Sequence, residues 1–306
     1  MSELKQKNVK LVEVGPRDGL QNEKKILSTE AKFEYIKLLS ETGLQTIEVT
    51  SFVSPKAIPQ MSDSKELYTK VNKELSDKIN YPCLVPNLIG YEGAKSVGVK
   101  EIALFSATSD AFTQKNINCT VDESFKRMSD VASEAKKDGI KLRGYISTAF
   151  GCPYAGEMSV DKLDHVLDLF FKLGVYEVSI GDTIGIANPL QVDTYLKALK
   201  AKYDFSKIAM HFHDTRGMAV ANILKSLEND IFTYDASSGG LGGCPYAKGA
   251  TGNVATEDVL YLFNSYGLEH GIDLEKLVDA SQFILEQIQK TTPSKYLTTL
   301  LKKREK

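Results

Sequence analysis

Cysteine and histidine are both scarce in this sequence, with four of each among 306 residues. The cysteines stand at positions 83, 119, 152 and 244, so no two of them form a CxxC pair. This spacing argues against the usual ligand pattern of a structural zinc site. In a chain of this length it also favours reduced thiols over a disulfide framework.

Long apolar runs and a strong net charge are also missing. No segment approaches the roughly 18 consecutive apolar residues of a membrane span, and the opening MSELKQKNVK has no apolar stretch of the secretory type. The formal net charge of −2 provides no basic excess for nucleic acid. We therefore expect a cytoplasmic protein with no membrane or nucleic-acid partner, ending in a solvated, frayed KKREK.

Short apolar runs rich in β-forming residues alternate with longer segments of helical periodicity. One helical segment is expected to start at Ser28 as its N-cap and to stop at Gly43, and another is expected to end at Gly139. The eight strand-like runs are VKLVEV (9–14), TIEVTSF (46–52), YPCLVP (81–86), EIALFSA (101–107), KLRGYIST (141–148), YEVSIG (176–181), KIAMHFH (207–213) and IFTYDASS (231–238).

This alternation predicts parallel strands joined by right-handed crossovers. Eight strand–helix units in order favour an α/β fold of the closed (β/α)₈, or TIM-barrel, type over about 9–266. An open doubly wound sheet is the alternative. Additional C-terminal helices are expected within about 267–295, where they would cover one barrel end or contact a second subunit. No low-complexity linker divides the chain, so we expect one domain, 1–306.

Polar side chains cluster where the predicted strands end, which is where barrels of this type carry their active sites. They are Arg17, Asp18 and Gln21 after the first strand, Glu48 in the second, Asp182 after the sixth, and His211 and His213 in the seventh.

His211 and His213 are one residue apart, so in a strand their side chains share one face and Phe212 points to the other. Asp18 follows the first strand, which lies two places from the seventh in a closed barrel. Two imidazoles and a carboxylate suit a divalent cation, Mg²⁺ or Mn²⁺, and less strongly Co²⁺, Fe²⁺ or Zn²⁺. The alternative is a pair of histidines that form hydrogen bonds at the rim without a metal.

Glu48 lies inside an otherwise apolar or small run, and a buried carboxylate is costly unless it is paired. Arg17 is the expected partner, in either a structural or a catalytic role. For Arg17 and Asp18 themselves, an ordinary surface ion pair is the alternative reading.

Six glycines surround Cys244, which makes this loop a candidate lid and its thiol a candidate proton donor or acceptor. An incidental loop cysteine is the alternative. Cys152 lies in the same pentapeptide, GCPYA, which occurs at 151–155 and 243–247. Asn253 either caps the eighth helix or presents its amide oxygen to the metal.

Seven segments together resemble the 3-hydroxy-3-methylglutaryl-CoA (HMG-CoA) lyase family, part of the HMGL-like superfamily of metal-dependent TIM-barrel lyases. The match runs from about residue 10 to 290. Related condensing enzymes, such as isopropylmalate and homocitrate synthases, lack the cysteine loop. The segments are VEVGPRDGLQNE, IEVTSFVSPKAIPQM, TQKNINCTVDES, GCPYAGE, GDTIG, HFHDTRGMAVAN and GGLGGCPYAKGATGNVATED.

The resemblance implies roles for individual residues. The metal ligands would be Asp18, His211, His213 and Asn253. Catalysis would fall to Arg17, Cys244, Glu48, Asp18 and His211, and substrate binding to Arg17, Gln21 and Asp182.

The resemblance also implies an activity, the divalent-metal-dependent cleavage of (S)-HMG-CoA to acetyl-CoA and acetoacetate, as in leucine catabolism and ketone-body formation. It implies a cytoplasmic homodimer acting on an acyl-CoA. A condensing transferase of the same superfamily and a non-catalytic metal-binding barrel are the alternatives.

Overall fold

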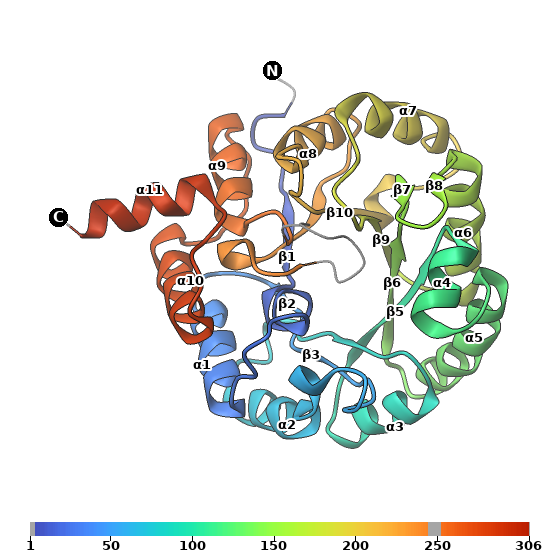
Figure 1. Cartoon of the computed structure of the whole chain (residues 1–306), viewed down its shortest axis with the longest axis horizontal. Helices are drawn as coiled ribbons and strands as arrows, with labels where there is room; N and C mark the ends of the chain where they lie inside the picture. The colour runs from blue at the N-terminus through green and yellow to red at the C-terminus, as the bar shows by residue number, and fades with distance from the viewer. Residues whose placement is uncertain (1–3, 244–251, 306) are drawn as a thin grey trace.

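A ring of parallel strands surrounded by helices forms the molecule (Figure 1). The computed structural model describes residues 4–243 and 252–305. The strands of the ring are β1 (Lys10–Glu13), β2 (Thr46–Ile47), β3 (Thr50–Ser51), β4 (Cys83–Leu84), β5 (Glu101–Ala107), β6 (Lys141–Ser147), β9 (Glu177–Asp182), β10 (Ile208–Phe212) and β11 (Thr233–Ala236). A separate antiparallel pair joins β7 (Gly151–Cys152) to β8 (Gly156–Glu157).

The ring closes through the segment 46–51. Its first half, β2, pairs with β1, and its second half, β3, pairs with β4, both in parallel. Between the halves, the Glu48 N–H donates to the Glu13 carbonyl at 2.9 Å and the Val49 N–H donates to the Pro82 carbonyl at 3.0 Å. The two halves are therefore one barrel strand whose backbone bonds to both neighbours, and the predicted (β/α)₈ barrel is confirmed.

Helices alternate with the strands around the outside of the ring. The helices that follow successive barrel strands are α1 (Thr29–Ser40), α2 (Ser64–Glu74), α3 (Leu88–Ser96), α4 (Asp110–Ile117) with α5 (Val121–Lys137), α6 (Val160–Leu173), α7 (Pro189–Leu199), α8 (Ala219–Leu227) and α9 (Thr256–Tyr266). Ser28 caps α1 as predicted, because its hydroxyl accepts from the Ala31 N–H at 3.2 Å. No helix in 4–243 or 252–305 is both long and apolar enough to cross a membrane.

The C-terminal region departs from the sequence-based expectation. Two helices follow the barrel, α10 (Leu274–Ile288) and α11 (Lys295–Arg304). The sequence predicted a frayed end at KKREK, and this prediction is wrong for the residues up to Arg304. Arg304 is helical and forms ion pairs with Glu275 and Asp279, both at 2.6 Å. These two acids on α10 are four residues apart, a spacing that puts them on one helix face.

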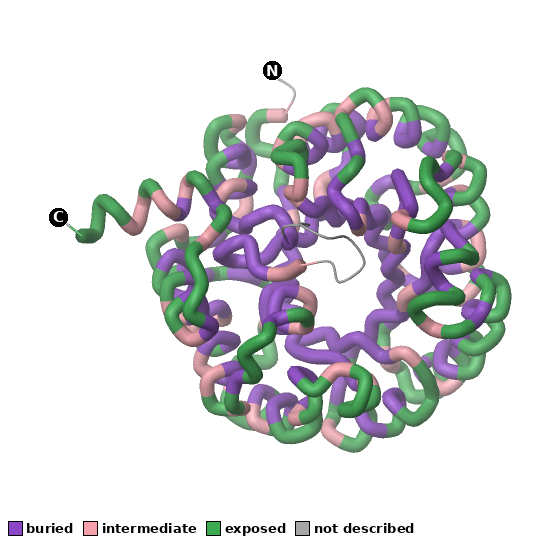
Figure 2. Tube along the Cα trace, viewed as in Figure 1, coloured by how far each residue is buried: buried purple, intermediate pink, exposed green. Residues whose placement is uncertain are grey.

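Buried positions follow the strand ring and the inward sides of the helices, whereas exposed positions lie on the outer sides (Figure 2). Phe212 points outward into the helical layer, as the alternation of a strand predicts. Its ring packs on Phe150 with centroids 6.1 Å apart, and Phe150 stacks on Tyr195 of α7 at 5.5 Å. This packing directs His211 of β10, and His213 directly after the strand, toward the barrel interior.

The strand order places β11 between β1 and β10. All three are parallel, so their carboxyl ends lie at the same end of the barrel. The fold therefore brings the segments after β1, β10 and β11 together at one mouth.

Candidate active site

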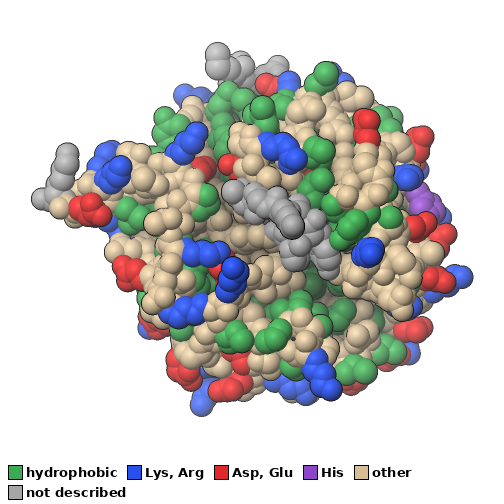
Figure 3. All heavy atoms as spheres, viewed as in Figure 1, with side chains coloured by type: hydrophobic (Ala, Val, Ile, Leu, Met, Phe, Trp, Pro, Cys, Tyr) green, Lys and Arg blue, Asp and Glu red, His purple; other side chains and the backbone are tan. Residues whose placement is uncertain are grey.

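A cavity of about 580 Å³ opens at the carboxyl ends of the strands. Its walls include Arg17, Asp18, His211 and His213, together with apolar side chains such as Phe105. Larger hollows of about 830 and 850 Å³ lie at the opposite end of the barrel, but neither includes the two histidines. Acidic and basic side chains are intermixed around the rim of the face in view (Figure 3).

Arg17 and Asp18 lie in a single π-helical turn, Gly15–Gly19, directly after β1. The Gly19 N–H donates to the Val14 carbonyl at 3.1 Å, the five-residue spacing of a π-turn. Such turns are often found at functional sites. Gly15 suits this turn, because a Cβ at this position would meet the Tyr35 hydroxyl and lie 2.6 Å from the Glu13 carboxylate, so these buried side chains would have to shift.

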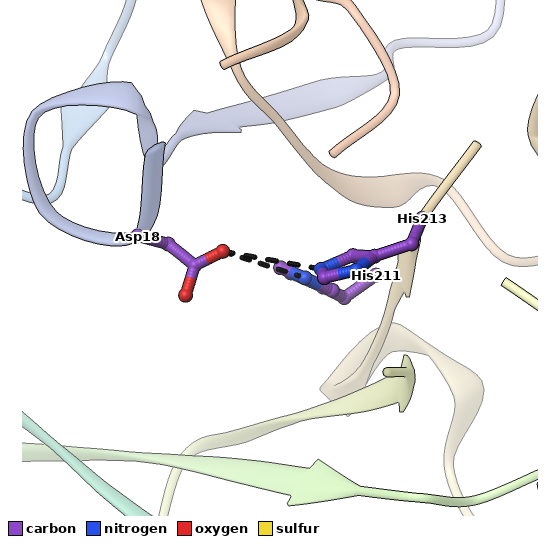
Figure 4. A group of neighbouring side chains, drawn as sticks. All are labelled: Asp18, His211 and His213. Atoms are coloured by element: carbon purple, nitrogen blue, oxygen red, sulfur yellow. Dashed lines mark ion pairs between the residues drawn. The ribbon is translucent and has the colours of Figure 1, made fainter. Parts of the chain in front are cut away.

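Asp18, His211 and His213 converge at the mouth from two neighbouring parts of the barrel (Figure 4). The Nε2 atoms of both histidines lie 4.0 Å from Asp18 Oδ2, and one ligand atom from each residue lies within 4.8 Å of the others. The imidazole centroids are 5.2 Å apart. These distances exceed hydrogen-bond length, so the contacts drawn as dashed lines in Figure 4 are long ion pairs, and the three groups face a common point without hydrogen bonds between them.

The protonation states of Asp18 and His213 favour binding of a cation. Burial would raise the pKa of Asp18, but Arg17 and the two histidines lower it to about 2, so the carboxylate is ionised. Burial, assisted by His211, lowers the pKa of His213 to about 4, which leaves a neutral ring with a free lone pair. A neutral imidazole beside an ionised carboxylate is the form in which these side chains bind metals.

Asn253 completes the group. Its Nδ2 donates to Asp18 Oδ2 at 2.8 Å and to the Leu241 carbonyl at 3.1 Å, while its backbone bridges to His213. Its Oδ1 is buried without a hydrogen-bond partner among the described residues. Since a buried polar atom normally has a partner, this oxygen fits the role of a metal ligand. It does not cap α9, whose N-cap is Ala255.

Arg17 is anchored on both sides. Its Nε donates to Glu48 Oε2 at 2.8 Å and its Nη1 to Asp18 Oδ1 at 2.6 Å. The guanidinium lies over the Tyr145 ring, 5.2 Å from the centroid, and the Tyr145 hydroxyl also donates to Glu48. Arg17 is only 6% exposed, so the Arg17–Asp18 contact is not a surface ion pair. Glu48 has the partner that the sequence predicted.

The remaining predicted site residues lie in different surroundings. Gln21 lines the cavity, and its Oε1 is buried with no partner in the described part of the chain. Asp182 is not among the cavity-lining residues. Its carboxylate instead accepts the Ile186 and Ala187 N–H groups at 2.9 and 3.0 Å. Cys244 lies outside the described residues, directly after the cavity-lining Gly243.

Sequence reasoning missed a second set of buried polar residues under the cavity. Asp235 of β11 contacts His211 and forms an ion pair with Arg143 of β6 at 2.7 Å. Ser179 and Tyr145 complete the set. The sequence did contain a signal for these residues. Arg143 in KLRGYIST and Asp235 in IFTYDASS are charged residues inside strand-like runs, and a buried charge needs a partner, as was argued for Glu48.

Comparison with known proteins agrees with this arrangement. The profile of the HMGL-like family matches residues 8–284. The chain belongs to this family. It is similar to a crystal structure of hydroxymethylglutaryl-CoA lyase from Pseudomonas aeruginosa, with a TM-score of 0.94 and 46% identity over 97% of this chain and 99% of that one. The family resemblance inferred from the seven segments is therefore confirmed.

Curated relatives similar to this HMGL-like chain also carry the name of this lyase. It is 48% identical over 289 residues to human mitochondrial hydroxymethylglutaryl-CoA lyase, covering 94% of this chain and 88% of the relative. It is 47% identical over 296 residues to the rat cytoplasmic 3-hydroxy-3-methylglutaryl-CoA lyase, covering 97% and 86%.

Two buried glutamates accept hydrogen bonds from the loops of this HMGL-like site. Glu13 accepts N–H bonds from Gly15 at 2.8 Å and Ser238 at 2.9 Å, so it joins the Arg17 turn to the loop after β11. Glu257 accepts from the Gly239 N–H at 3.0 Å in the same loop. Burial raises the pKa of Glu13 to about 8 and that of Glu257 to about 7.

We predict that Glu257→Gln removes part of the pH dependence of stability. Since the pKa of Glu257 is raised from 4.5 to about 7 on folding, the folded state binds the proton more tightly. The contribution of this proton binding to the free energy of unfolding is complete below pH 4.5 and is lost as pH rises to about 7. The wild type should lose on the order of 3 kcal/mol across this window relative to the variant.

The measurement is the free energy of unfolding by denaturant at several pH values from 4.5 to 8. The exposed Glu66→Gln of α2 serves as a control and should follow the wild type. Parallel pH profiles for the wild type and Glu257→Gln would contradict the prediction.

Proposed function

We propose that this protein is a hydroxymethylglutaryl-CoA lyase, a carbon–carbon lyase that cleaves (S)-HMG-CoA to acetyl-CoA and acetoacetate. The observation that carries the proposal is the convergence of Asp18, His211 and His213 beside Arg17 in one cavity. Membership of the HMGL-like family and the 48% identity to the human lyase support the substrate.

A divalent cation, Mg²⁺ or Mn²⁺, would be held by Asp18, His211, His213 and Asn253. The buried, unpartnered Asn253 Oδ1 and the neutral His213 ring support this donor set. When bound, such an ion supplies Lewis acidity toward the C3 hydroxyl and an adjacent oxygen of the substrate.

Arg17 would stabilise the charge that develops during cleavage. Loss of the C3 hydroxyl proton and scission of the C2–C3 bond leave acetoacetate and the enolate of acetyl-CoA. Two Arg17 nitrogens are engaged by Glu48 and Asp18, and Nη2 makes no hydrogen bond within the described residues. A guanidinium fixed in this way donates to an enolate oxygen without reorganising. Glu48 is then its positioning partner, and Gln21 lines the cavity as a further substrate contact.

A proton must return to C2 of the enolate to give acetyl-CoA. Cys244 and His211 are the candidates, because the thiol follows a cavity-lining glycine and the imidazole faces the cavity. Glycine-rich segments beside an active site commonly act as lids. Asp182 remains proposed as a substrate residue on the family resemblance alone.

We also propose a cellular location and an oligomeric state for the enzyme. The rat relative named as cytoplasmic supports a cytoplasmic location. We propose a homodimer whose protomers each form one catalytic domain, 1–306. The surface that α10 and α11 add outside the barrel is available for a second subunit.

The direct test uses purified protein stripped of metal by a chelator and then resupplied with Mg²⁺ or Mn²⁺. We expect HMG-CoA to yield acetyl-CoA and acetoacetate in equal amounts only after resupply. Intact HMG-CoA would contradict the proposal. Thiol release from acetyl-CoA plus a 2-oxo acid would instead support the condensing-enzyme alternative.

Arg17→Gln should lower kcat by more than about 10²-fold, by analogy with the loss of an oxyanion donor. Metal content should be unchanged, because Arg17 donates no ligand atom. The control is Arg304→Gln on α11, whose ion pairs lie far along the chain from the cavity residues. Near-normal kcat in Arg17→Gln would overturn the role assigned to this residue.

Cys244→Ser should reduce turnover about 10²-fold or more if the thiol delivers the proton. Cys152→Ser is a matched control, because it changes the same residue in the same pentapeptide. Cys152 is buried in a cluster with Phe112 and Met158. Equal turnover in the two variants would remove Cys244 from the mechanism.

A further inference from the structure

Asp235 occupies the barrel interior beneath the metal-binding group. It is 1% exposed, and its Oδ2 lies 3.2 Å from His211 Nδ1. Asp235 and His211 stand opposite each other in the pairing of β11 with β10. The contact therefore reaches His211 on the ring nitrogen that faces away from Asp18.

Strands β9 and β6, which follow β10 in the ring, supply two further contacts to this carboxylate. Arg143 Nη2 donates to Oδ1 at 2.7 Å, and the Ser179 hydroxyl donates to Oδ2 at 2.6 Å. Arg143 is itself held by Glu177, whose Oε1 accepts from Arg143 Nε at 2.7 Å. The donors come from β6 and β9, so Asp235 cannot rotate without breaking several buried contacts.

The contacts of Asp235 determine which His211 nitrogen carries hydrogen. Arg143 pairs with this carboxylate in a buried ion pair, and both of its oxygens accept hydrogen bonds, Oδ1 from Arg143 Nη2 and Oδ2 from the Ser179 hydroxyl. An ionised carboxylate only accepts hydrogen bonds. His211 therefore donates through Nδ1–H, and whenever the ring is neutral its lone pair is on Nε2, 4.0 Å from Asp18 Oδ2.

His213 provides an internal contrast. Its Nδ1 is buried and has no hydrogen-bond partner among residues 4–243 and 252–305. The backbone of His213 bridges to Asn253, and no carboxylate of the described residues bonds to its Nδ1. Of the two imidazoles, His211 alone is held by a carboxylate on the side away from Asp18 in this part of the chain.

We propose that Asp235, fixed by Arg143 and Ser179, is a positioning residue that holds His211 in the Nδ1–H tautomer and so presents Nε2 to the cation. This inference rests on the metal role in the proposed function. It deepens that role, because carboxylates that orient ligating histidines typically contribute 10- to 100-fold in metal affinity.

The first experiment uses metal-free protein labelled with ¹⁵N-histidine. With only four histidines in the chain, two-bond proton–nitrogen spectra resolve each ring. We expect the neutral form of the wild-type His211 ring to carry its hydrogen on Nδ1, and Asp235→Asn to lose this fixed assignment. Observation of His211 as the Nε2–H form in the wild type would overturn the proposal, whatever the variants do.

The second experiment measures Mn²⁺ affinity by titration. Asp235→Asn should weaken binding about 10- to 100-fold, and Ser179→Ala should weaken it less, in the same direction. Ser106→Ala removes a hydroxyl that is equally buried on β5 but bonds to Ser124 of α5, and it should bind Mn²⁺ like the wild type.

The outcomes separate the two proposals. Unchanged Mn²⁺ affinity in both the Asp235 and Ser179 variants would overturn the positioning role while leaving the metal site intact. A wild type that binds no Mn²⁺ would instead defeat the proposed function, and the tautomer spectra would still decide whether Asp235 fixes His211. If Asp235→Asn fails to fold, Ser179→Ala and the wild-type spectra carry the test.

Discussion

Pairing of buried charge inside a closed barrel is the constraint on which this site depends. The guanidinium groups of Arg17 and Arg143 both lie over the Tyr145 ring, 5.2 and 4.9 Å from its centroid, and each bonds to two carboxylates. Breaking one such buried pair costs about 3–5 kcal/mol, because it leaves the partner charge unpaired. The groups at the mouth are therefore held by the same contacts that stabilise the barrel.

Local patterns predicted much of this arrangement. The alternation of strand-like and helical segments specified the barrel, and the HxH spacing placed His211 and His213 on one face because a strand has a period of two. Closure of the ring then determined that Asp18 lies near them, since β1 and β10 are separated only by β11. Glu48 was identified because a carboxylate in an apolar run needs a partner, and Arg17 supplies it.

Other features depend on contacts that no local pattern contains. Arg143 reaches Asp235 across 92 positions in the sequence, and only the register of β6, β9, β10 and β11 brings them together. The frayed C-terminus was wrong because Arg304 pairs with acids on α10, a tertiary contact. Asn253 illustrates competition between local and long-range bonds, because its amide bonds to Asp18 although its position beside a helix start favoured capping.

The backbone on either side of 244–251 is joined by contacts between its two flanks. The Asn253 N–H donates to the Leu241 carbonyl at 3.3 Å, and the Asp214 N–H donates to the Gly252 carbonyl at 3.1 Å. A Cβ on Gly252 would lie only 2.6 Å from Gly242, so the two flanks touch. Because these contacts join the two flanks directly, the residues between them could be exchanged or lengthened while Asn253 keeps its place beside Asp18.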